Sequence, residues 1–101
     1  MGTQTELQSL LESLLGSRNV YYQPPEGVKM KYDAIKYSKS DIESKYANNA
    51  KYSKFNKYEL IVIARLPDHE VINKLLDLPY CSYDRHYIAD NLHHDILTLY
   101  Y

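Results

Sequence analysis

The last nineteen residues, from Tyr83 to Tyr101, alternate apolar and polar side chains out to a doubly aromatic end. A period of two is the pattern of a β-strand that buries one of its faces. Terminal residues usually fray, so Leu97, Leu99 and the two final tyrosines are expected here only if something buries them. The final strand is therefore predicted to belong to the core or to an interface.

Tyrosine carries most of the aromatic content. The chain has twelve tyrosines, one phenylalanine and no tryptophan. A tyrosine ring is apolar along its body and forms hydrogen bonds at its tip, which suits contact surfaces that stay partly hydrated. At 101 residues the chain is expected to form a single domain, residues 1–101, with a core of limited size.

A helix is predicted at the start of the chain. Thr3 and Glu6 have the spacing of a capping box, and Gly16 follows the last apolar position. Between them runs one apolar stripe with helical spacing, made of Leu7, Leu10, Leu11, Leu14 and Leu15.

Turn and breaker residues divide the rest of the chain. The expected segments are a short strand at 19–23, a strand at 31–37, a long loop or mobile hairpin tip at 38–54, a central strand at 55–66, a helix capped by Asp68 and ended by Pro79, and two strands at 80–89 and 92–101 joined by a turn at Asp90 and Asn91. Val71, Ile72, Leu75 and Leu76 are predicted to form the inward face of the second helix. This order predicts an α+β fold, a mainly antiparallel sheet of four to five strands with two helices packed on one face.

Charge is unevenly distributed along the chain. The formal net charge is −1, yet residues 29–57 hold eight lysines against three acids. This lysine-rich segment is either a solvated loop or one of two unlike patches that meet between copies of the protein. Nucleic-acid binding is disfavoured because the segment has no arginine and the whole chain is slightly acidic.

No apolar run approaches the length needed to cross a bilayer, and no secretory signal is evident, so we expect cytosolic synthesis and no membrane partner. The single cysteine, Cys81, has no disulfide or zinc partner and is predicted to be a small buried hydrophobe.

Histidines supply the one cluster with metal-ligand residue types. His93 and His94 are adjacent on a strand and point to opposite faces, whereas His86 is expected to face His94 across the hairpin. A metal site is disfavoured because His93 and His94 cannot easily bind one ion together. Catalysis is disfavoured because the chain has no phosphate-binding loop or nucleophile elbow, and no cofactor is expected. Contacts near a turn or at an interface are the preferred role.

The order of elements, the opening segment from Leu10 to Tyr37 and the segment from Tyr58 to Tyr101 resemble small tail-assembly proteins of tailed bacteriophages. The likeness is to tail terminator (tail completion) proteins at the head-to-tail interface, and it covers nearly the whole chain through its hydrophobic and aromatic pattern.

The resemblance implies a non-enzymatic virion protein, assembled in the host cytoplasm and located in the tail or neck. Such a protein caps the tail tube as a ring, commonly hexameric, ends tube growth and presents a docking surface to the head-side connector. DNA would meet it only as the passing genome in the ring lumen.

Partner contacts are predicted at the lysine-rich segment and at the C-terminal hairpin. The residues are Lys39, Lys45, Tyr46, Lys51 and Tyr52 in the first, and Arg85, His86, Asp90, Asn91, His93 and His94 in the second. Three alternatives stay open: another neck protein such as a head-closure protein, a small metal-dependent hydrolase that uses His86, His94 and Asp95, and a host-directed interaction module.

Overall fold

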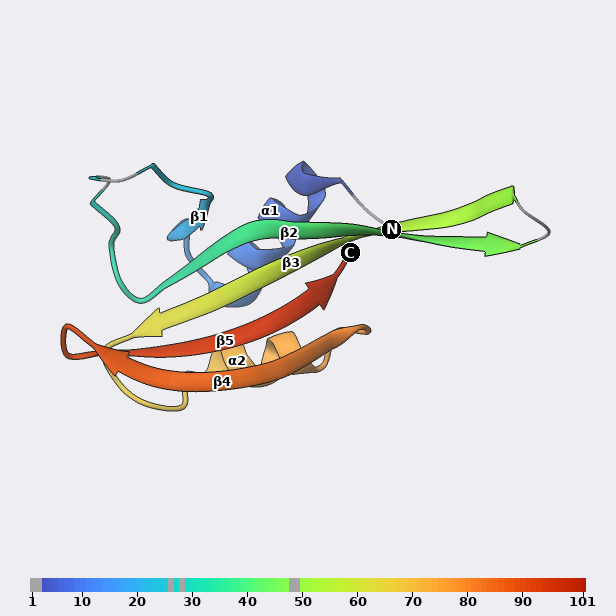
Figure 1. Cartoon of the computed structure of the whole chain (residues 1–101). Coiled ribbons are helices and arrows are strands. Elements are labelled where there is room, and N and C mark those ends of the chain that lie inside the picture. Colours follow the sequence, from blue (N-terminus) through green and yellow to red (C-terminus); the bar gives the residue numbers. More distant parts are fainter. Residues whose placement is uncertain (1–2, 26, 28, 48–49) are drawn as a thin grey trace.

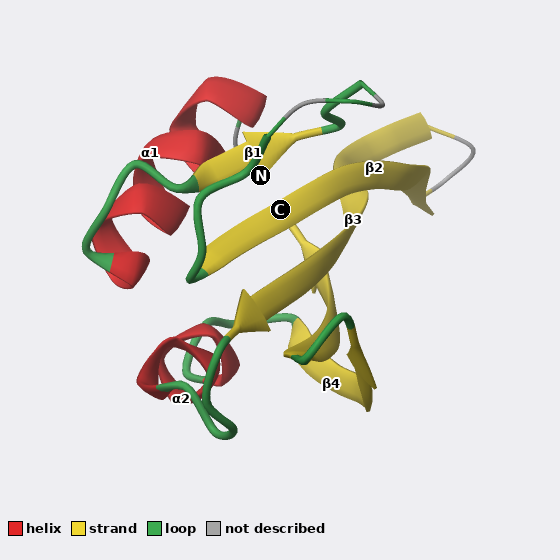
Figure 2. Ribbon diagram, turned by 90° about the vertical axis from the view of Figure 1, so that its left-hand side faces the viewer, coloured by secondary structure: helices red, strands yellow, loops and turns green. Residues whose placement is uncertain are grey.

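A five-stranded sheet with two helices on one of its faces forms the protein, an α+β fold (Figures 1 and 2). The computed structural model describes residues 3–25, 27, 29–47 and 50–101, and along 41–47 and 50–55 it describes the backbone alone. The elements in chain order are α1 (Gln4–Leu15), β1 (Val20–Tyr22), β2 (Ala34–Ala47), β3 (Ala50–Ala64), α2 (Glu70–Leu76), β4 (Cys81–Ala89) and β5 (Leu92–Tyr100).

The strand order across the sheet is β1-β2-β3-β5-β4. The three longer pairings are antiparallel, and β1 alone runs parallel to its neighbour β2, with Val20 opposite Ile35. The prediction of a mainly antiparallel sheet with two helices on one face is confirmed. The C-terminal strand β5 lies between β3 and β4, so the aromatic end of the chain is part of the sheet interior.

The first helix begins and ends where its sequence indicates. The Thr3 hydroxyl accepts a hydrogen bond from the Glu6 backbone N–H, and Gly16 ends the helix with φ 79°, a left-handed conformation that glycine adopts without strain. Leu7 and Leu11 are fully buried on the face that meets the sheet.

The second helix is capped by a different residue from the one predicted. Asp68 has a positive φ of 57° in the preceding turn, and His69 is the N-cap, accepting a hydrogen bond from the Val71 backbone N–H through Nδ1 at 3.1 Å. Val71 and Leu75 are buried as expected, but Leu76 is exposed because seven residues make barely two turns and leave one face to solvent.

The core lies between the helices and the covered face of the sheet. Alternate residues of the strands point into it, and they come from four strands: Val20, Ile35, Tyr37, Tyr58, Leu60, Val62, Leu97 and Leu99. Cys81 packs against this cluster but is only half-buried, whereas the sequence predicted a buried residue.

The segment 38–54, for which a long loop was one expectation, is mainly strand. The β2–β3 ladder continues from Ala34 paired with Ile63 to Ala47 paired with Ala50, with irregularities near Ser40 and Lys45. The loop interpretation is wrong because a low apolar content does not by itself prevent two segments from pairing as strands. Figure 1 shows this part of the hairpin extending well beyond the body of the protein, in agreement with principal extents of 51 × 25 × 23 Å.

Candidate functional site

The C-terminal hairpin turns where the sequence predicts. Asp90 and Asn91 have φ values of 53° and 62°, the left-handed pair that a two-residue turn between antiparallel strands requires. The turn pairs Ala89 with Leu92, and this register sets which side chains meet along β4 and β5.

That register separates His86 from His94, so the expectation that they face each other is wrong. Counting back from the two-residue turn places His86 opposite Asp95 and Tyr87 opposite His94. His86 instead contacts His93, its diagonal neighbour, with Nε2 and Nδ1 3.1 Å apart and the two rings stacked. Within the part of the chain that the structure describes, no three His, Cys, Asp or Glu side chains gather into a group suited to a metal ion.

The face of the sheet away from the helices carries an aromatic group at the same hairpin. The Tyr87 and His94 rings are stacked with centroids 4.6 Å apart and an interplanar angle of 11°, and the Arg85 guanidinium lies 6.0 Å from the Tyr87 centroid. Ile96, opposite Arg85, continues this group toward the middle of the sheet. The predicted residues Arg85 and His94 thus share one face, while His86 and His93 lie on the other.

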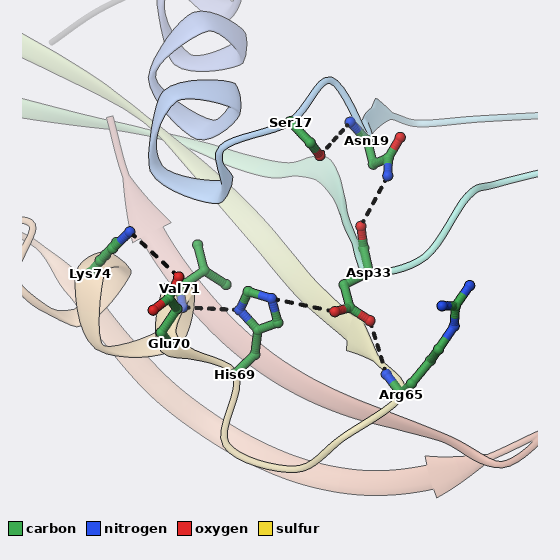
Figure 3. A network of polar contacts seen from close by, with 8 residues as sticks. All are labelled: Ser17, Asn19, Asp33, Arg65, His69, Glu70, Val71 and Lys74. Atoms are coloured by element: carbon green, nitrogen blue, oxygen red, sulfur yellow. Dashed lines mark hydrogen bonds and ion pairs between the residues drawn. The ribbon is translucent and has the colours of Figure 1, made fainter.

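A pair that the sequence reading missed joins three elements near the start of α2 (Figure 3). One carboxylate oxygen of Asp33 lies 3.5 Å from His69 Nε2, and the other accepts a hydrogen bond from the Arg65 backbone N–H at 3.0 Å. The Asp33 carbonyl accepts a second hydrogen bond, from the Asn19 side chain.

This Asp33–His69 pair resembles a catalytic dyad in composition but not in geometry. His69 Nδ1 accepts a hydrogen bond from the Val71 backbone, so the ring proton resides on Nε2 and is directed at Asp33. Both ring nitrogens are occupied, and neither is available to take a proton from a substrate. The pair therefore anchors α2 to β2 and β3.

A cavity of about 300 Å³ opens between α2 and the β4–β5 hairpin. Its lining residues are Asp68, His69, Ile72, Asn73, Leu76, Tyr83 and Asp95. Asp95 is only 6% exposed and accepts a 2.6 Å hydrogen bond from the Tyr83 hydroxyl, which raises the pKa of Tyr83 to about 12. At neutral pH this tyrosine keeps its proton, so it cannot serve as a general base there.

The cysteine is equally unsuited to nucleophilic chemistry. Burial, with a smaller effect of the Asp84 charge, raises the pKa of Cys81 to about 11. Because the thiolate is the reactive form, a thiol with such a pKa is inert near neutral pH.

The residues predicted in the lysine-rich segment all lie on the projecting hairpin. Lys39 is exposed on β2 near the body, and Lys45, Tyr46, Lys51 and Tyr52 lie farther out along β2 and β3. The side chains of the last four are outside the described residues. We call the projecting part, Ser40–Ala47 and Ala50–Phe55, the arm.

Comparison with known proteins finds no family model that matches this chain and no matching sequence among curated proteins. Among the described residues, no helix is long and apolar enough to cross a membrane.

Proposed function

We propose that this protein is a structural component of a bacteriophage tail, which forms a ring at the end of the tail tube, ends tube growth and provides the docking surface for the head-side connector. The resemblance of the sequence to tail terminator proteins is the source of this proposal. The observation that carries it is the arm, which projects from the body where a self-contained domain would place a short turn (Figure 1).

An arm of this kind is better suited to binding a protein than to packing within one molecule. A two-stranded ribbon is marginally stable by itself in water, so a long one gains stability when a neighbouring chain covers it. The chain also presents exposed tyrosine and isoleucine side chains on β4, the type of side chain that anchors protein contacts.

The three side chains that the hydrolase alternative needs do not lie on one face of the sheet. It requires His86, His94 and Asp95 to converge, but His94 lies on the sheet face opposite to His86 and Asp95. The aromatic and histidine pairs of the hairpin instead suit a contact surface with a polar rim.

The test is complementation of a phage in which the gene has been deleted. The intact protein should restore tails of uniform length joined to heads. A variant in which an Asn-Gly turn replaces residues 43–55 and joins the paired residues Ile42 and Asn56 should leave heads free and tails overlong. Circular dichroism checks that this variant keeps the folded body. Normal particles in the complete absence of the protein would overturn the proposal, as would its absence from purified particles.

A further inference from the structure

β4 lies at the edge of the sheet, and most of its residues are exposed. Among the described residues it pairs with β5 alone, and its other backbone edge has no neighbour. Seven consecutive residues, 82–88, are exposed, and they include the large side chains of Tyr83, Tyr87 and Ile88, with Ile88 63% exposed.

Edge strands of monomeric proteins are normally protected against pairing with other chains. The opposite edge of this sheet is protected because β1 is only three residues long. β4 is nine residues long and contains no lysine or proline, and its charged residues Asp84 and Arg85 lie at its one irregularity, between Tyr83 and Arg85. It is therefore a template on which a strand from another chain can be added.

The arm supplies a strand that lacks a partner. β1 pairs with β2 at Ile35–Tyr37, and Lys39 donates its backbone N–H to the Gln23 side chain. From Ser40 to Ala47 the outer edge of β2 has no strand beside it within the described part of the chain. About every second residue of this stretch directs its backbone N–H and C=O to the outer edge, where these groups can pair with a strand of another chain.

Length matches between these two edges, and the regions around them carry opposite net charge. At a rise of about 3.3 Å per residue, eight arm residues span about 26 Å and β4 spans about 30 Å. The stretch 36–57, which contains the arm and its base, has six lysines and two acids, for a net charge of +4. Ser40–Ala47 itself has two acids and one lysine, so the positive charge comes from the base of the arm and from β3. The stretch 66–101, which contains β4 and α2, has six acids and two basic residues, for a net charge of −4. Opposite charge favours the approach of the arm to the β4 side of another molecule.

From these observations we propose that the arm of one copy adds to the sheet of a second copy by pairing the outer edge of β2, Ser40–Ala47, with β4. This inference rests on the proposed function in that it names the contact by which the ring forms. Two different surfaces of the chain meet, so each copy has one donor arm and one acceptor edge, and the assembly grows head to tail until rotation closes it.

A two-fold dimer through β4 itself is the competing arrangement. Antiparallel pairing of β4 about its middle residue would place Arg85 beside Arg85 of the other copy, and like charges directly opposite are destabilising. Such a dimer would also leave the arm without a partner.

A lysine pair on the edge strand tests the proposal with a charge-matched control. The edge variant Tyr87→Lys with Ile88→Lys places one lysine on each face of β4, which opposes pairing as natural edge lysines do. The control Leu66→Lys with Leu76→Lys adds the same charge to the same acidic region, at exposed side chains outside the edge. Native mass spectrometry and sedimentation measure self-association, and amide hydrogen exchange at low and high protein concentration shows which strands become protected.

If the arm pairs with β4, the wild-type and control proteins should associate to a similar extent. Amides of both β4 and the arm should become protected from exchange as association proceeds. The edge variant should associate at least about tenfold more weakly, a loss of roughly 1.4 kcal/mol per contact. Equal association of edge variant and control would overturn the pairing, as would protection of β4 without the arm, which marks the two-fold dimer. A wild-type protein that stays monomeric at millimolar concentration, with no protection of either strand, would also overturn it.

Failure of this inference differs from failure of the proposed function. If the edge variant still restores joined tails of uniform length in the complementation test, the ring role stands and the contact is elsewhere. If the intact protein is missing from particles, the ring role fails whatever the association data show.

Discussion

Two neighbouring tyrosines in the core, Tyr37 and Tyr58, differ in what their hydroxyl groups contact. Both side chains are buried on the covered face of the sheet, with ring centroids 5.9 Å apart. The Tyr37 hydroxyl accepts a 2.7 Å hydrogen bond from Gln4 and donates a 2.5 Å hydrogen bond to Gln8, both on α1. The Tyr58 hydroxyl is buried and makes no hydrogen bond of accepted length and angle within the described part of the chain, and its contact with the Asn56 side chain is a weak one.

Removing the two hydroxyls should therefore have opposite effects on the free energy of unfolding. Tyr37→Phe removes two hydrogen bonds, and at a net value of about 1 kcal/mol each the loss is about 1–2 kcal/mol. Tyr58→Phe removes a polar group that lost its water on folding without gaining a hydrogen bond of accepted length and angle. The expected result is no loss, or a gain of up to about 1 kcal/mol.

Urea unfolding followed by far-UV circular dichroism at pH 7 measures both effects, and thermal midpoints should move by about 4–8 °C per kcal/mol for a domain near this size. Tyr87→Phe, at an exposed ring, is the control for loss of a solvated hydroxyl and should change stability by less than about 0.5 kcal/mol. A loss for Tyr58→Phe as large as that for Tyr37→Phe would refute the reasoning, since it would require a partner for the Tyr58 hydroxyl.

Three further predictions concern the caps and the buried carboxylate. His69→Ala removes the N-cap of α2 and its contact with Asp33, and urea unfolding should show a loss of about 1–2 kcal/mol; an unchanged midpoint would contradict the capping role. Gly16→Ala should cost about 1 kcal/mol in the same assay, because φ is 79° and no atom within 4 Å of an added Cβ offers a compensating contact. Folding raises the pKa of Tyr83 from 10.0 to about 12, chiefly through the hydrogen bond to Asp95. The contribution of this hydrogen bond to the free energy of unfolding is therefore complete below pH 10 and is lost as the pH rises toward 12. Asp95→Asn should lower the tyrosinate titration midpoint of Tyr83 toward 10, measured by the difference in ultraviolet absorbance from wild type, and an unchanged titration would show that Asp95 is not the cause.

The limits of the first helix and the hairpin turn could be predicted locally, because a capping hydroxyl, a left-handed glycine and an Asp-Asn turn act within a few residues. The limits of the second helix differ from the prediction, since it is capped by His69 and ends at Leu76, before Pro79. Asp68 has the residue type of a cap, but its positive φ places it in the turn, and the His69 ring reaches both the helix N-terminus and Asp33. Asp33 is 36 residues away in the chain, so no local pattern could reveal that contact.

The sequence by itself determined the class of fold, since the periods of its apolar residues separate helices from strands and the breakers separate the elements. It also located the residues of the lysine-rich segment and the C-terminal hairpin. Counting back from the two-residue turn is enough to show that His86 contacts His93 and not His94, because a register difference of one residue moves a side chain to the other side of a sheet. Segment 38–54 pairs with a neighbouring stretch of the chain, but its polar composition does not distinguish a paired hairpin from a loop. Only the tertiary structure decided that β5 pairs with β3, which leaves β4 at the edge of the sheet, because these two strands are distant in the chain and the pattern of one strand does not identify its partner.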